Sequence, residues 1–383
     1  MSTIADRLKA LEPTERTMRE FTETRMIDEA GLVYSHLHTE TLEPWRAEDL
    51  ARKGYRLGFY NIDRGDPEGQ LGYEDSIMAT GEYALANLIR HDVTAAPDSI
   101  GAASLALFAI LRVIYEGELY EKGFLPKPHG GMRRAGYSHE ISVDQYIKAI
   151  VAMEAYRPFA SPALNRLMDE KLVDMADYHM NRNFIHPRRE SFVVTPENRT
   201  HGIAFFIPIC WLAYRITGEA KYRDALPRFD GVLDELLADE ELPMVANIIG
   251  LFMEGFHLAL QAGYEDDRLA QILGRFWDAR EAMTRERGLR HNIPEQDFPS
   301  TRVTRISSFA PIVQQYFPEK QPLELGLEIL EDIRDPATMV HVGDRSKAHP
   351  LHQYDADTIH AVNIASWLVA YWRMAKGNVK REE

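Results

Sequence analysis

Helical segments of two kinds alternate along the chain, and this alternation constrains the fold more than any other feature of the sequence. Segments that are apolar or small-residue-rich around most of their surface are typical of buried helices, whereas segments with one apolar stripe cover a core. The first kind is expected near 74–90, 142–156, 202–217, 243–261, 305–317 and 355–375. The second kind is expected near 4–26, 103–115, 163–182, 219–238, 267–286 and 322–333, although 103–115 is itself nearly all apolar.

Six buried helices that alternate with six half-exposed ones predict an all-α (α/α)6 barrel, in which an outer ring of helices wraps an inner ring. We expect one such domain over residues 1–383, and no segment shows a convincing strand pattern. No repeat of fixed length is visible, which argues against a solenoid. Pro13 is expected to bend or interrupt the first predicted helix, whereas 219–238 is expected to remain one helix despite Pro227, and Pro311 is unfavourable inside 305–317.

The lengths of the connections predict where the working face of this barrel lies. Connections from an inner to the next outer helix are short, whereas most connections from an outer to the next inner helix are long, at about 27–73, 116–141, 183–201, 287–304 and 334–354. Long loops in compact domains are commonly functional. They meet at the N-terminal ends of the inner helices, where free N–H groups and helix dipoles suit an anionic substrate.

Composition excludes several classes of function. The 383 residues carry 44 basic and 59 acidic side chains, and the net charge of −15 argues against a nucleic-acid partner. The first residues do not read as a signal peptide, and no membrane span is expected, so we expect a cytoplasmic protein with no membrane partner. Cys210, the single cysteine, is expected to be a buried inert thiol. The sequence is compatible with a homo-oligomer.

Polar residues concentrate just before or at the start of the predicted inner helices. Segment 72–76, GYEDS, places Tyr73, Glu74 and Asp75 at the first of these starts. Segment 123–146 is the densest polar stretch and contains Arg133, Arg134, Tyr137, His139, Glu140, Asp144 and Gln145. Carboxylates and histidine suit general acid–base catalysis, and an arginine fork suits a substrate carboxylate.

Two further segments contribute candidates. Residues 197–202, ENRTHG, supply Asn198, Arg199 and His201, and the segment at 349–360 supplies His349, His352, Asp355, Asp357 and His360. The second spacing leaves a divalent ion open but matches no fixed zinc motif, and the His36–His38 pair is a weak signal alone. We therefore predict no metal and no cofactor. The chain also has no nucleotide-binding, kinase or serine-hydrolase motif.

The order of three segments, GYEDSIMATGEYALANLI, then GFLPKP, then SHEISVDQYIKAIVAMEAYRPFASPALNRLMDEKL, resembles bacterial proteins of the six-hairpin glycosidase-like superfamily. This group includes unsaturated glucuronyl and rhamnogalacturonyl hydrolases, β-glucuronidases and several polysaccharide lyases. The resemblance covers about residues 72–185 and implies an (α/α)6 barrel that acts on sugars bearing a carboxylate. It implies site roles for Glu74, Asp75, Asp144 and Gln145, whereas His139 and Glu140 depart from the small polar residues usual at that place.

The leading hypothesis is a glycoside hydrolase acting on a uronic-acid-containing oligosaccharide. Asp144 is then the general acid/base, with Glu140, Glu74 or Asp75 as the second carboxylate. Arg133 or Arg134 holds the uronate, and Tyr73, Tyr137 and Gln145 contribute to substrate binding.

Three alternatives stay open. A polysaccharide lyase would use Asn198 or Arg199 to neutralise the substrate carboxylate, His201 or His139 as base, and Tyr137 as acid. A sugar epimerase would rely on paired histidines such as His201 and His360. In a non-catalytic carbohydrate-binding barrel, the carboxylates would only cap helices.

Overall fold

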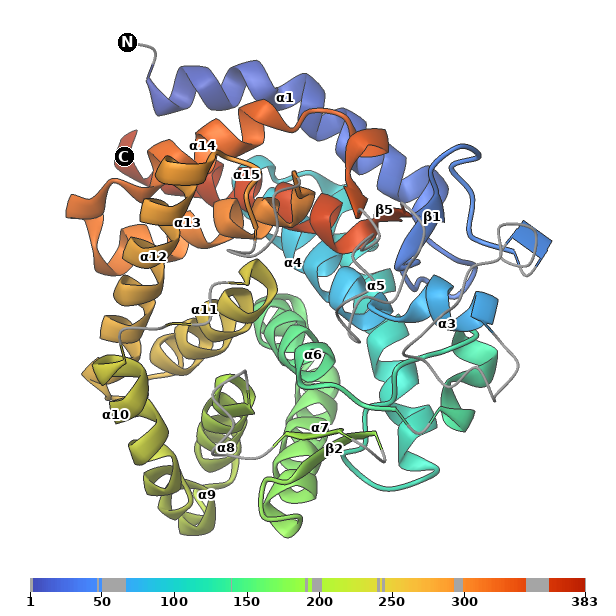
Figure 1. The fold of residues 1–383 in the computed structure, drawn as a ribbon. Coiled ribbons are helices and arrows are strands. Elements are labelled where there is room, and N and C mark those ends of the chain that lie inside the picture. The colour runs from blue at the N-terminus through green and yellow to red at the C-terminus, as the bar shows by residue number, and fades with distance from the viewer. Residues whose placement is uncertain are drawn as a thin grey trace.

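The buried helices of the chain stand side by side around the centre of the molecule (Figure 1). A computed structural model of the chain describes residues 3–46, 48–49, 67–138, 140–189, 192–194, 202–239, 242, 245–292, 299–341 and 358–382. The inner helices are α4 (Ser76–Thr94), α6 (Val143–Tyr156), α8 (Gly202–Thr217), α11 (Ala246–Gln261), α13 (Thr304–Tyr316) and α15 (Ala361–Glu382). Each contacts the next in chain order, and α15 packs against α4, so the ring is closed.

An outer layer of helices covers this ring. It consists of α1 (Ile4–Phe21), α5 (Pro97–Glu118), α7 (Pro162–Asn181), the pair α9 (Ala220–Asp224) and α10 (Asp230–Ala238), α12 (Asp267–Arg287) and α14 (Pro322–Asp332). A further short helix, α3 (Pro67–Tyr73), precedes α4. The first outer helix, α1, packs against the last inner helix, α15, as Figure 1 shows. The predicted (α/α)6 barrel is therefore confirmed.

Burial explains why the two kinds of helix differ in sequence. In α4 every residue from Ser76 to Ile89 is buried, so all faces of that stretch must be apolar, small or internally hydrogen-bonded. By contrast, α12 buries one stripe and leaves its other face charged. Cys210 lies inside α8, where burial raises the pKa of its thiol, so it is the inert thiol that was expected.

Two prolines bear on the predicted helix boundaries. Pro13 lies inside α1, which continues to Phe21 and then into a π-helical turn over Thr22–Met26, so Pro13 does not interrupt this helix. The single helix expected over 219–238 is wrong, because a 3-10 turn over Leu226–Phe229 separates α9 from α10. Pro227 lies in this turn, and its missing N–H disfavours an uninterrupted α-helix.

The structure also contains short strands that the sequence pattern does not reveal. Five short strands are described: β1 (His36–His38), β2 (His186–Arg189), β3 (Phe192–Val194), β4 (Val340–His341) and β5 (Thr358–His360). They form a β1-β5-β4 sheet and a β2-β3 hairpin, both antiparallel. Strands of two to four residues are too short to show an alternating pattern. Because β5 occupies 358–360, the last inner helix begins at Ala361, later than the expected 355.

Helix α5 is the one described helix long and apolar enough to cross a membrane by length and composition, although no such helix was expected. It is apolar on two sides. One side packs against α4 and α6, and half of its most apolar window is buried inside the barrel. Its outer side exposes Leu105, Phe108 and Tyr115. A core helix of this kind passes the same test, so packing in the barrel accounts for much of its apolar character.

Candidate active site

Hydrogen bonds join the N-terminal ends of the inner helices at one end of the barrel. The side-chain amide of Gln145, in the first turn of α6, donates to the backbone oxygen of Glu74 just before α4 at 3.3 Å. Thr304 Oγ1, at the start of α13, donates to the backbone oxygen of Asn363 in α15 at 2.9 Å. Polar residues that are distant in sequence are therefore brought together at the ends that carry free N–H groups and positive helix dipoles.

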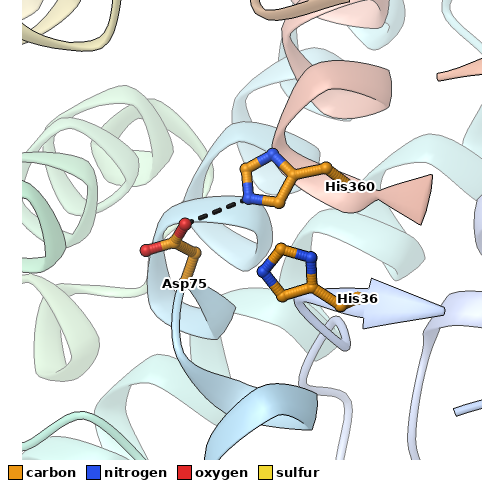
Figure 2. A group of neighbouring side chains, drawn as sticks. All are labelled: His36, Asp75 and His360. Carbon is orange, nitrogen blue, oxygen red and sulfur yellow. Dashed lines mark hydrogen bonds and ion pairs between the residues drawn. The ribbon is translucent and has the colours of Figure 1, made fainter. Parts of the chain in front are cut away.

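The first group at this end consists of His36, Asp75 and His360, which Figure 2 shows. His36 lies opposite His360 in the β1–β5 pair, and the two rings are 4.6 Å apart between centroids. His360 Nε2 lies 3.0 Å from Asp75 Oδ2, and the Asp75 N–H donates to Ser35 Oγ at 2.6 Å. Ser35, the residue just before β1, thus helps to fix the position of Asp75, and β5 positions the histidine that contacts the carboxylate.

Electrostatics favour an ionised Asp75 beside neutral histidines. Burial opposes ionisation of Asp75, but the hydrogen bond with His360 and the positive charge of Lys127 hold its pKa well below the usual range. Burial lowers the pKa of His360, and burial together with His360 lowers that of His36. The group therefore provides a carboxylate whose negative charge is kept by its hydrogen bonds.

The second group consists of Glu74, Lys127, His129 and Glu140. Lys127 is completely buried, and its ammonium contacts Glu74 Oε1 directly and Glu140 Oε1 at 3.4 Å. His129 Nε2 lies 3.1 Å from the other oxygen of Glu74. Lys127 compensates the negative charges of both Glu74 and Glu140, and these ion pairs hold the segment that precedes α6 against the start of α4. Because both carboxylates are engaged in this way, they are poorly placed to exchange protons with a substrate.

Asp144 differs from these carboxylates because it has no cationic partner among the residues that the structure describes. It lies in the first turn of α6 and is 7% exposed. Its Oδ1 accepts the backbone N–H of Gln145 at 2.8 Å. Gln145 itself is fully buried, and its side-chain oxygen has no partner among the described residues. Asp144 is thus a carboxyl group that remains available to a ligand.

Buried polar atoms that lack a partner in the described part of the chain gather at the same end. Six of them belong to the first turns of inner helices or to the residue just before: Ser76 Oγ, Ser142 Oγ, Gln145 Oε1, Asn247 Oδ1, Arg305 Nε and Ser307 Oγ. Buried polar groups are nearly always hydrogen-bonded in folded proteins. Polar side chains with unused hydrogen-bonding capacity are thus concentrated at this end of the barrel.

Other predicted residues lie elsewhere. Arg133 is exposed and pairs with Glu29 at 3.0 Å, and Arg134 is exposed as well. The Tyr73 hydroxyl donates to Asp28 Oδ2 at 3.0 Å, so it is already engaged. His139, Asn198, Arg199 and His201 lie outside the described residues, as do His349, His352, Asp355 and Asp357, and only the backbone of Tyr137 is described.

The structure also adds residues that the sequence analysis did not place in the site, namely His36, Lys127, His129 and Arg305. His36 was visible only as half of a weak histidine pair, and Lys127 and His129 lie in a segment rich in polar residues. The position of Arg305 could have been noticed in the sequence, because it lies in the first turn of a predicted helix. A positive charge there interacts unfavourably with the helix dipole unless it has another role.

His36, Asp75 and His360 each offer one ligand atom, and these atoms lie within 4.8 Å of one another. Two imidazoles and a carboxylate suit a divalent transition metal. Against this, Arg302 and Arg305 lie close enough to His360 to lower its pKa, and Arg302 acts on His36 in the same way. These positive charges oppose a divalent cation and favour an anion.

No protein-family model matches the sequence, and no curated protein matches it significantly. Solved structures do match. An unsaturated glucuronyl hydrolase specific for heparin is 10% identical, with a TM-score of 0.56 over 98% of both chains. An α-amylase from Clostridium perfringens is 10% identical, with a TM-score of 0.50 over 94% of this chain and 97% of that one.

An inactive variant of an α-1,6-mannanase from Salegentibacter, in complex with α-1,6-mannotriose, is 9% identical, with a TM-score of 0.50 over 95% of this chain and 98% of that one. Similarity at this level of identity establishes the fold alone. The chain therefore shares the (α/α)6 barrel fold of these solved structures.

Proposed function

We propose that this protein is a glycoside hydrolase that acts on uronic-acid-containing oligosaccharides at the N-terminal ends of the inner helices. The observation that carries the proposal is the pair Asp75 and Asp144, which stand at the starts of the neighbouring helices α4 and α6 among buried polar atoms that lack partners. Enzymes that hydrolyse glycosidic bonds generally use two carboxyl groups in different environments.

The environments of the two aspartates support different roles. Asp75 is held ionised by His360, so it suits the carboxylate that activates water or attacks the sugar. Asp144 has no cationic partner among the described residues, so it suits the group that gives a proton to the leaving oxygen. Glu74 and Glu140, which were also candidates for the second carboxylate, share Lys127 and suit this role less well.

The test compares Asp144→Asn and Asp75→Asn with the parent on a panel of uronides. Each variant should lose about 10²–10⁴-fold in turnover, because a positioned acid or base contributes that much. Asp98→Asn is the matched control, since Asp98 is an exposed residue of the outer helix α5 that pairs with Arg90. Equal hydrolysis by Asp144→Asn and the parent would show that Asp144 has no catalytic role.

A further inference from the structure

Arg305 is a buried cation without a counterion among the described residues. It is the second residue of the inner helix α13 and is 4% exposed. Its side chain makes no hydrogen bond or ion pair within the described part of the chain, and its buried Nε has no partner there. A charged side chain almost never stays buried in this way, because desolvation of the charge then goes uncompensated.

The other buried cations of the described chain have partners. Lys127 contacts Glu74, Lys148 contacts Glu82 at 2.8 Å, and Lys171 contacts Glu118 at 2.7 Å. Arg280 donates to the backbone oxygens of His291 and Asn292. The barrel therefore pairs its buried cations as a rule, and Arg305 departs from that rule at the end where the candidate active site lies.

Positive groups lie near Arg305, and the ionised carboxylate of Asp75 is engaged with His360 rather than with Arg305. The N-terminal end of α13 adds the positive pole of its dipole to the guanidinium. Arg302 lies one turn earlier, and both arginines are close enough to His360 to lower its pKa. Neither the dipole nor these neighbours can compensate Arg305, so the site is suited to a negatively charged ligand.

We propose that Arg305 is the residue that binds the anionic group of the sugar, through a two-pronged hydrogen bond between its guanidinium and a carboxylate. The planar guanidinium fork matches a carboxylate in geometry. The inference rests on the proposed function in that it places the sugar at this end of the barrel. It assigns to Arg305 the role that the sequence suggested for Arg133 or Arg134, both of which are exposed.

Calorimetric titration of the full chain with D-glucuronate, D-glucose and inorganic sulfate tests this assignment without any need for turnover. The parent should bind glucuronate more tightly than glucose, and Arg305→Met should weaken glucuronate binding by about 10- to 100-fold while leaving glucose binding unchanged. Arg305→Lys should retain part of the affinity, and Arg133→Met, the rival arginine, should bind like the parent. Binding of sulfate in preference to glucuronate would overturn the carboxylate assignment, as would a loss of glucuronate binding in Arg133→Met alone.

Thermal unfolding without ligand separates a binding role from a structural one. A buried arginine that binds a ligand destabilises the ligand-free protein, because its charge is then desolvated without a partner. Arg305→Met should therefore melt at the same temperature as the parent or higher. A lower melting temperature, together with unchanged glucuronate binding, would make Arg305 structural and overturn the inference. Glucuronate binding that depends on Arg305 without hydrolysis of any uronide would contradict only the hydrolase proposal. Uronide hydrolysis unaffected by Arg305→Met would contradict only the role of Arg305.

Discussion

His179 and His257 show how single residues of the barrel set its response to pH. His179 is fully buried, and its ring lies edge-on to Tyr146 and Phe205 at 4.9 Å. Burial lowers the pKa of His179 to about 4 and that of His257 to about 4. Both rings are therefore neutral in the folded protein at pH values where the unfolded chain already binds a proton.

This difference predicts acid-sensitive stability. Between the unfolded pKa near 6.5 and the folded value of about 4, the unfolded state binds more protons, so the free energy of unfolding falls as the pH falls through this window. Each such histidine contributes about 1.4 kcal/mol per pH unit, or roughly 3 kcal/mol across the window.

Urea unfolding of His179→Phe at pH 7 and pH 4.5 measures this contribution. Phenylalanine fits the aromatic surroundings and removes the titrating group, so the loss of stability between the two pH values should be roughly 2 kcal/mol smaller than in the parent. An equal loss in parent and variant would mean that His179 is not held neutral by burial.

At the scale of helices, close approach of the inner helices depends on glycine. Gly255 of α11 faces α8, and a Cβ atom at this position would lie 1.8 Å from the backbone oxygen of Ala204. A backbone oxygen inside a packed ring has little freedom to move away. The spacing of α8 and α11, and through it the closure of the inner ring, therefore requires the absence of a side chain at Gly255.

Gly255→Ala should reduce the free energy of unfolding by about 1–3 kcal/mol or more, because it overpacks this contact. Gly101→Ala is the matched control. Gly101 is exposed in the outer helix α5, no atom lies within 4 Å of its added Cβ, and alanine is the better helix former there, by up to about 1 kcal/mol. Chemical denaturation of both variants decides the point, and a Gly255→Ala protein as stable as the Gly101→Ala protein would refute the close-contact explanation.

At the scale of the whole molecule, the ring could be predicted because the apolar pattern of each helix reflects how much of its surface is buried. The stretch Ser76–Ile89 is buried on all sides, whereas α12 is buried on one side only. The local pattern of apolar and polar residues differs accordingly. Such local patterns cannot show which side chains from distant parts of the sequence come into contact. His360 and Asp75 are 285 positions apart and meet only because β5 and α4 start at the same end of the barrel.

The candidate site was accordingly predicted only in part. Asp75, Asp144 and Gln145 were identified because they stand at helix starts, which sequence patterns locate well. Arg133 lies only eleven positions before Asp144, yet it turns out to be an exposed residue paired with Glu29. Nearness in sequence does not place a loop side chain beside Asp144, whereas Arg305, far along the chain, lies in the first turn of the inner helix α13.

Product analysis on a uronide oligosaccharide is the most direct test of the central claim that this barrel end hydrolyses glycosidic bonds. We predict that the parent releases new reducing ends without a gain in ultraviolet absorbance, and that Asp144→Asn releases few or none. Reducing ends that appear together with the absorbance of a new C4–C5 double bond would identify a lyase instead. No cleavage of any uronide by the parent would contradict the account altogether.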